Sequence, residues 1–208
     1  VAGDVREEFK PIEDDPDMPR VLLIGDSISV GYTLPVREKL AGEANVHRVL
    51  ENCGPTSKGV QRLDAWLGDG NWDVIHFNFG LHDLKIMENG KHQVPLDEYE
   101  ENLEQMVARM KQTGAELVWA STTPVPDPVG APERHSEDVI KYNAVAAAIM
   151  REHSVMIDDL YEFALPQLEV IQRPENVHFT EKGSEVLARQ VAESIREALV
   201  GPKTAGGG

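Results

Sequence analysis

The chain has 208 residues, of which 41% are hydrophobic and 27% are charged, a balance typical of a soluble globular protein. Its formal net charge of −16 argues against nucleic acid or an anionic membrane surface as a partner, because such binding needs an excess of lysine and arginine. No apolar run approaches the roughly 18 residues of a membrane span, and the length predicts one domain.

The two ends of the chain differ in composition from its middle. We expect residues 1–19 to form an N-terminal extension, residues 20–200 a single domain, and residues 201–208 a flexible tail with almost no apolar content. The extension lacks the basic end and apolar centre of a signal peptide. Cys53 is the single cysteine, so no intramolecular disulfide forms. The compartment stays open, with a secreted or periplasmic location favoured and any signal peptide absent from this chain.

Short apolar runs alternate with amphipathic patterns along the chain. The apolar runs predict five strands buried on both faces, at residues 21–24, 46–50, 74–79, 117–120 and 155–157. Apolar residues at steps of three and four predict helices over residues 96–110, 136–150 and 180–199. This alternation predicts a parallel sheet with helices on both faces, and the proline-rich stretch 124–132 is expected to be a surface loop.

Polar residues lie beside three of the predicted strands and helices, at points that a parallel sheet would bring together. Ser27 follows the first strand, His82 follows the third, and His178 precedes the last helix. Ligands bind outside the carboxyl ends of such strands. A serine at a strand-to-helix turn with a histidine from a distant loop is the nucleophile and general base of acyl transfer. Alternatively, Ser27 only caps the helix that follows.

Four short motifs surround these residues in a definite order. They are Gly25-Asp26-Ser27-Ile28-Ser29, Asn52-Cys53-Gly54, Gly80-Leu81-His82-Asp83 and the segment from Glu175 to His178. Together they resemble the four blocks of the SGNH hydrolase superfamily, the GDSL esterases and lipases, over about residues 21–200. The resemblance implies ester hydrolysis without a cofactor. It also implies a flavodoxin-like three-layer α/β/α sandwich, here with a central five-stranded parallel sheet.

The resemblance also implies roles for single residues. Ser27 matches the nucleophile and His178 the base. The oxyanion hole would use the backbone N–H groups of Ser27 and Gly54 and the side chain of His82. Such donors meet charge that develops only in the transition state. We expect Asp26 and Asp83 to support the site by holding loops through backbone hydrogen bonds.

The third block has His82 where the family usually has asparagine. An imidazole N–H donates to an oxyanion, but the ring also titrates near neutral pH. A neutral ring would donate one hydrogen bond, whereas a protonated ring would stabilise the oxyanion more strongly and disfavour positive charge on His178. This Gly-x-His-Asp form resembles that of family members from polysaccharide-degrading settings, so we interpret it as a variant of the site.

The fourth block has Glu175 where the family has a triad aspartate. The third member of a triad orients the histidine and supports its charge, so a substitute is chemically tolerable. Two alternatives follow: either the Glu175 carboxylate binds the far nitrogen of the imidazole, or a backbone carbonyl takes that role in a Ser-His dyad.

Other chemistries have weaker support in the sequence. A metal site could be drawn from His76, His82, Asp83 and His92, but these residues lack the compact histidine spacing of a zinc helix, and we expect no metal. Cys53 is interpreted as a small buried thiol. The acidic run at residues 13–17 is interpreted as a solvated face. The first strand's loop has no glycine-rich phosphate-binding pattern, which argues against a nucleotide.

The sequence therefore predicts a serine esterase acting on short acyl groups, acetyl in particular, on a carbohydrate. The carbohydrate follows from the resemblance to a family rich in sugar deacetylases, and the short acyl group from the absence of an apolar lid sequence. Two alternatives stay open: a lysophospholipase or thioesterase of the same family, and a non-catalytic carbohydrate-binding relative. The sequence leaves the oligomeric state open.

Overall fold

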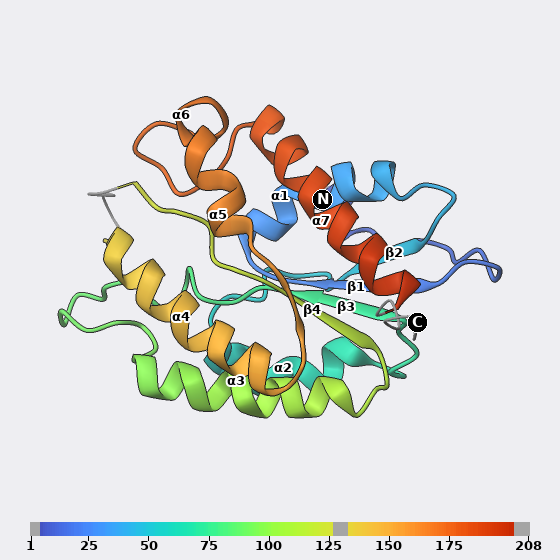
Figure 1. Ribbon diagram of the computed structural model, residues 1–208, viewed down its shortest axis with the longest axis horizontal. Coiled ribbons are helices and arrows are strands. Elements are labelled where there is room, and N and C mark those ends of the chain that lie inside the picture. Colours follow the sequence, from blue (N-terminus) through green and yellow to red (C-terminus); the bar gives the residue numbers. More distant parts are fainter. Residues whose placement is uncertain (1–4, 127–132, 202–208) are drawn as a thin grey trace, which may run out of the picture.

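A computed structural model describes residues 5–126 and 133–201. Its centre is a five-stranded sheet in the order β2-β1-β3-β4-β5, with every neighbouring pair parallel (Figure 1). The strands are β1 (Arg20–Ile24), β2 (Asn45–Arg48), β3 (Val74–Phe77), β4 (Glu116–Ala120) and β5 (Met156–Asp158). The predicted α/β fold with a five-stranded parallel sheet is thereby confirmed, with strand ends shifted by one to two residues.

Helices cover both faces of the sheet. On one face lie α1 (Ser27–Lys39) and α7 (Glu181–Val200), and on the other lie α2 (Thr56–Leu67), α3 (Leu96–Lys111) and α4 (Ser136–Glu152) (Figure 1). The sequence patterns located α3, α4 and α7 but not α2. Three short helices precede α7: α5 (Leu160–Ala164), η2 (Leu165–Gln167) and α6 (Leu168–Ile171).

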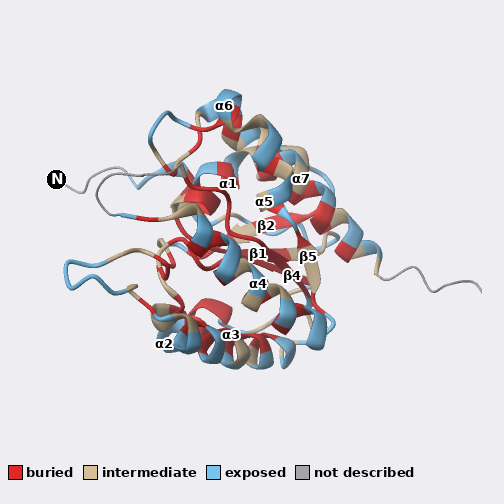
Figure 2. Cartoon of the chain, turned by 60° about the vertical axis from the view of Figure 1, so that its left-hand side comes forward, coloured by how far each residue is buried: buried red, intermediate tan, exposed pale blue. Residues whose placement is uncertain are grey.

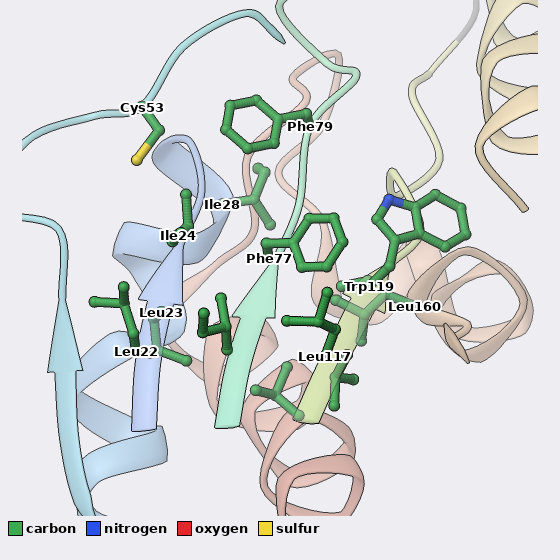
Figure 3. Packing of buried hydrophobic residues seen from close by; sticks show 14 of the residues in the cluster. Leu22, Leu23, Ile24, Ile28, Cys53, Phe77, Phe79, Leu117, Trp119 and Leu160 are labelled. Carbon is green, nitrogen blue, oxygen red and sulfur yellow. The ribbon is translucent and has the colours of Figure 1, made fainter. Parts of the chain in front are cut away.

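The core lies between the sheet and the helix layers. All four residues of β3 are buried, His76 among them, which explains why its apolar residues do not alternate with exposed polar ones. Figure 2 shows the buried residues in the strands and on the helix faces that turn toward them. Figure 3 shows Leu23, Phe77 and Trp119 projecting from three adjacent strands. The apolar stripe of α3 is buried, as its spacing predicts.

The strand order fixes where a ligand can bind. The chain runs from β1 outward to β2 and then returns to β3 on the other side of β1, so the order reverses between β1 and β3. A crevice forms outside the carboxyl ends of two such strands, since their following loops diverge in opposite directions. Ile24 and Phe77, which end these strands, are paired in the sheet.

The segment before β1 packs against the edge strand β2. The Asn45 side chain of β2 donates to the carbonyls of Asp15 and Met18, at 2.8 and 3.1 Å, and accepts from the Asp15 N–H. Nearer its start lies the short helix η1 (Glu7–Phe9). No helix in the described part of the chain has the length and apolarity needed to cross a membrane. Most of the predicted loop 124–132 and tail 201–208 lies outside the described residues.

Candidate active site

Ser27 is placed by the turn between β1 and α1. The turn is tight, because a Cβ on Gly25 would lie 2.6 Å from the Cβ of Ser29. Buried Asp26 is the N-cap of α1, and its Oδ1 accepts from the Ile28 N–H at 2.9 Å. Asp26, rather than Ser27, therefore provides the helix cap. This arrangement leaves the hydroxyl of Ser27 available for another partner.

That partner is His178, which arrives from the loop before α7. The Ser27 Oγ and His178 Nε2 atoms lie 2.9 Å apart, although the residues are 151 positions apart in the sequence. The loop is closed by a bridge between Gln172 and Phe179 and by a hydrogen bond from the Arg173 N–H to the His178 carbonyl. Both partners are half-buried. The arrangement has the contact that proton transfer from a nucleophile to a base requires.

The other ring nitrogen of His178 binds Asn176. Its Nδ1 donates to Asn176 Oδ1 at 2.7 Å, and the same oxygen accepts from the His178 backbone N–H at 2.9 Å. Because Asn Oδ1 only accepts, the ring proton lies on Nδ1, and Nε2 is left as the nitrogen that can accept the Ser27 proton. Asn176 therefore sets both the orientation and the tautomer of the ring.

The structure departs here from the expectation placed on Glu175. Its side chain is exposed, its backbone is left-handed with φ 51°, and it makes no hydrogen bond or ion pair with any described residue. The Nδ1 partner is neither the Glu175 carboxylate nor a backbone carbonyl, but a side-chain amide. The left-handed turn explains this, since it carries Glu175 outward and brings the next residue under the ring. The sequence signal that could have indicated Asn176 is the tendency of an asparagine side chain to hydrogen-bond the backbone two residues further along the chain.

Burial, and after it the nearby cations, favour the neutral forms of the two imidazoles. Burial lowers the pKa of His178, and the nearby Arg173 guanidinium lowers it further, while Asp26 opposes both. Burial also lowers the pKa of His82, again against the pull of Asp26. Asp26 and Arg134 act on both rings, which indicates that the rings share one electrostatic neighbourhood. A neutral His178 is the form that a general base requires.

The three expected oxyanion donors differ in their surroundings. Ser27 opens α1, so its backbone N–H has no acceptor within the helix. The Gly54 N–H, in a left-handed turn with φ 64°, donates to Asn52 Oδ1 at 3.0 Å. No hydrogen bond engages the His82 ring within residues 5–126 and 133–201. Two of the donors are thus uncommitted, and the third is held by a side chain that a substrate would have to displace.

Asp83 joins the loop after β3 to the start of α2. Its Oδ1 accepts from both the backbone N–H and the hydroxyl of Thr56, at 2.8 and 2.5 Å. Burial raises the pKa of Asp83 to about 7. Gly80, in the same loop, has φ 149°, and a Cβ there would lie 2.2 Å from Thr122 Oγ1, so this position tolerates only glycine. Through Thr56, Asp83 keeps the Gly54 turn and the His82 turn in fixed register.

Ser27 and His178 line a cavity of about 1010 Å³. Its walls come from α1, α7, the Asn52 loop and the N-terminal segment. Most of the lining is polar, with five glutamates against two arginines: Glu8, Glu38, Glu51, Glu181, Glu185, Arg6 and Arg173. Among the described residues no group of three histidine, cysteine or acidic side chains could hold a metal ion. His76, His82, Asp83 and His92, which the sequence could suggest as such a group, therefore do not form one.

The sequence profile of the GDSL-like lipase/acylhydrolase family matches residues 23–186, which include Ser27 and His178. The chain belongs to the GDSL-like lipase/acylhydrolase family. A GDSL esterase/lipase of Arabidopsis thaliana is 26% identical to this chain over 151 residues, which cover 64% of the chain and 62% of the relative. The expected family membership is thereby confirmed, and the N-terminal residues 5–19 lie outside the matched span.

Solved structures agree with this GDSL-like fold. A lipase/acylhydrolase from Enterococcus faecalis superposes with a TM-score of 0.74 at 22% identity, covering 86% of this chain and 96% of that one. An acetylxylan esterase from Geobacillus stearothermophilus superposes with a TM-score of 0.69 at 18% identity, covering 88% and 97%. At these identities the superpositions establish a shared fold.

Proposed function

We propose that this GDSL-like hydrolase is a serine esterase that removes short acyl groups, acetyl above all, from carbohydrates. The observation that carries the proposal is the 2.9 Å contact between Ser27 Oγ and His178 Nε2 at the wall of a large polar cavity. Acyl transfer requires a nucleophile paired with a base, whereas sugar binding alone does not need this pair.

The contacts define a reaction in two stages. Ser27 Oγ attacks the ester carbonyl while His178 Nε2 takes its proton, and the oxyanion is met by the backbone N–H of Ser27 together with Gly54 and His82. The tetrahedral species collapses, the C–O bond to the alcohol breaks, and His178 returns the proton to the leaving alcohol. Water then attacks the acyl-serine by the reverse use of His178 and releases the acid.

The lining of the cavity supports a short acyl group on a polar alcohol. Long acyl chains need apolar walls, whereas most residues that line this cavity are polar, among them glutamates, arginines and Asn52, with apolar residues such as Leu34 and Phe179 between them. A volume of about 1010 Å³ is far larger than an acetyl group and suits one or more sugar rings. The acetylxylan esterase with the same fold acts on a substrate of this kind and adds support by analogy.

The proposal is tested by hydrolysis of p-nitrophenyl esters of increasing chain length and by acetate release from acetylated xylo-oligosaccharides. We expect p-nitrophenyl acetate to be cleaved faster than the octanoate, and Ser27→Ala to abolish both activities. Ser184→Ala is the matched control, since Ser184 lines the same cavity without a hydrogen bond to His178. Undiminished turnover by Ser27→Ala would overturn the mechanism.

The two alternative functions give different results in the same tests. A lysophospholipase or long-chain thioesterase would prefer the octanoate to the acetate. A non-catalytic carbohydrate-binding relative would cleave neither ester and would form no adduct with a fluorophosphonate, which reacts with an activated serine. Intact mass before and after labelling, with Ser27→Ala beside the unaltered protein, therefore separates this relative from an esterase.

A further inference from the structure

Part of the wall of the catalytic cavity comes from a segment that the family profile does not match. Arg6, Glu8 and Phe9, in and beside η1, line the cavity that contains Ser27 and His178. We call these three side chains the N-terminal wall. The matched span begins only at residue 23. The wall is therefore a feature of this chain that family membership does not explain.

Two arginines of the matched fold hold this wall in place. The Arg37 guanidinium of α1 donates to the carbonyls of Glu7 and Lys10, at 3.5 and 3.4 Å, and to the carbonyl of Val46 at 3.0 Å. Since Glu7 begins η1 and Lys10 follows its end, Arg37 ties this turn to α1 and, through Val46, to β2.

The second arginine links the wall to the nucleophile's own turn. The Phe9 ring lies 5.4 Å from the guanidinium carbon of buried Arg48. Arg48 in turn donates to the Gly25 carbonyl at 3.2 Å and to the Ser29 and Thr33 hydroxyls. These acceptors flank Ser27 in the chain. The position of Phe9 is thus set by the same guanidinium that braces the Ser27 turn.

The charges that face the N-terminal wall are mainly negative. Glu8 is buried and pairs with Arg6, so this pair adds little net charge. Glu38, Glu181 and Glu185 line the cavity without an ion pair to any described residue, and Arg173 is the cation that faces them. Carboxylates gathered around one cleft produce a negative potential inside it, which raises the local concentration of cations and lowers that of anions.

We propose that the N-terminal wall receives the alcohol part of the ester, and that the cavity selects uncharged or cationic alcohols over anionic ones. This inference rests on the proposed esterase function. An acetyl group fills only a small part of a cavity of about 1010 Å³, so the rest of the cavity is left for the alcohol. Phe9 supplies the aromatic surface on which a sugar ring packs, and the glutamates supply acceptors for its hydroxyls.

Phe9→Ala tests the wall, with Ile12→Ala as the matched control. Ile12 belongs to the same segment but lines a different cavity, beside Trp66 and Trp72. For Phe9→Ala we expect the ratio of kcat/KM for an acetylated xylo-oligosaccharide to that for p-nitrophenyl acetate to fall about fivefold, mainly through KM. For Ile12→Ala we expect the ratio to stay at its original value. For Phe9→Leu, which keeps the apolar volume but loses the aromatic ring, we expect a ratio between those of the other two variants. This variant distinguishes loss of the ring from detachment of the whole segment.

The charge selection is tested with matched acetate esters. Methyl 4-acetoxybenzoate, 4-acetoxybenzoate and the 4-acetoxyphenyl-trimethylammonium ion carry the same acyl group on neutral, anionic and cationic alcohols. Each kcat/KM is divided by the rate of hydroxide-catalysed hydrolysis of the same ester. We expect this corrected value to be about fivefold lower for the anionic ester than for the neutral ester. The difference should shrink in 0.5 M salt and in the double variant Glu38→Gln, Glu185→Gln, but not in Glu13→Gln, which is exposed and outside the cavity.

The outcomes separate the two proposals. Two outcomes would overturn the role of the N-terminal wall and leave the esterase function standing, provided that p-nitrophenyl acetate is cleaved. One is an unchanged ratio in Phe9→Ala, and the other is equal kcat/KM for the three acetate esters. A preference for the anion would also overturn the inference and assign the alcohol to Arg173. Absence of any turnover and of fluorophosphonate labelling at Ser27 would overturn the esterase function and the wall together.

Discussion

Two clusters in this molecule contain a histidine, a serine and a side-chain oxygen acceptor, and they differ in how these are connected. In the cavity, His178 stands between Ser27 and Asn176, with one partner on each ring nitrogen. In the core, Asp158 is the centre: it binds His76 Nε2 at 3.0 Å and the Ser194 hydroxyl at 3.1 Å. The core cluster has all three residue types of a catalytic triad, but its serine contacts the carboxylate instead of the histidine.

Burial separates the two clusters further. Ser27 and His178 are half-buried at the cavity, whereas the side chains of His76 and Asp158 are fully buried. A nucleophile must reach a substrate and pass its proton to a base, and only the cavity cluster offers both. The core cluster instead joins β3, β5 and α7 through hydrogen bonds. Residue types alone therefore do not define a catalytic site; the order of the contacts and access to the cavity do.

The largest effect is expected from removing the histidine of the cavity cluster. His178→Ala should lower kcat/KM for p-nitrophenyl acetate about 10⁴-fold or more, because Ser27 then has no base for its proton. The free energy of unfolding should change little, since the ring is half-buried and its loop is closed by backbone bonds. Loss of folding in this variant, seen as a lowered urea midpoint, would contradict the separation between the two clusters.

Removing the histidine of the core cluster should have the opposite effect, with a loss of stability and little loss of activity. His76→Leu keeps apolar volume but deprives the buried Asp158 carboxylate of one partner, so we expect the free energy of unfolding to fall by about 3 kcal/mol. The kcat/KM of the folded fraction should stay within about twofold, because His76 is not among the residues that line the cavity. Urea denaturation with esterase assays below the transition checks both parts. A large loss of kcat/KM at full folding would break the comparison.

The sequence predicts most of the strands and long helices because burial of these elements requires a particular spacing of apolar residues. A strand buried on both faces is largely apolar, as at residues 21–24 of β1, and a helix that packs one face repeats its apolar residues every three to four positions, as in α3. The helix α2 was not predicted, although Trp66 and Leu67 follow Leu63 at steps of three and four residues. Ser27 and His178 were found because each follows or precedes a predicted element within a recognisable motif.

What the sequence missed depends on backbone geometry and on distant packing. The left-handed backbone of Glu175 decides that Asn176, and not Glu175, lies under the His178 ring. No residue type in this segment predicts that left-handed φ. The N-terminal wall was missed because its apolar content is small and its docking depends on Arg37 and Arg48, which are far from it in sequence. Polar contacts at long sequence separation leave no periodic signal.

A smaller effect than those of the two histidine variants is expected from Asn176→Ala. Without its Oδ1 the ring of His178 loses its partner on Nδ1, so a share of the rings adopts the wrong orientation or tautomer, and kcat should fall about 10- to 100-fold with KM little changed. Asn176→Asp should restore orientation and, through its charge, move the acid limb of the pH profile to higher pH. Equal kcat values for Asn176→Ala and the original protein would exclude the orienting role.

A shift of the pH profile is expected from Arg173→Gln. Only neutral His178 accepts the Ser27 proton, so kcat/KM rises with pH through the pKa of this ring, which burial and Arg173 place below its ordinary value. Removing the guanidinium takes away a charge that disfavours protonation. The pKa therefore rises and the acid limb moves to higher pH, with the plateau rate nearly unchanged. A limb that moves to lower pH would contradict the assignment of His178 as the titrating base.

The smallest effect is expected where the motif alone would predict a large one. Glu175→Gln removes the only carboxylate of the fourth motif, yet its side chain is exposed and makes no contact with His178 within the described residues, so kcat/KM should stay within about twofold. The pH profile should keep its position as well. A matched loss of kcat in Glu175→Gln and Asn176→Ala would show that the carboxylate turns inward when substrate binds. If only Asn176→Ala is impaired, the third position of this site is an amide, and the cavity cluster operates without any carboxylate on its histidine, in contrast to the core cluster built around Asp158.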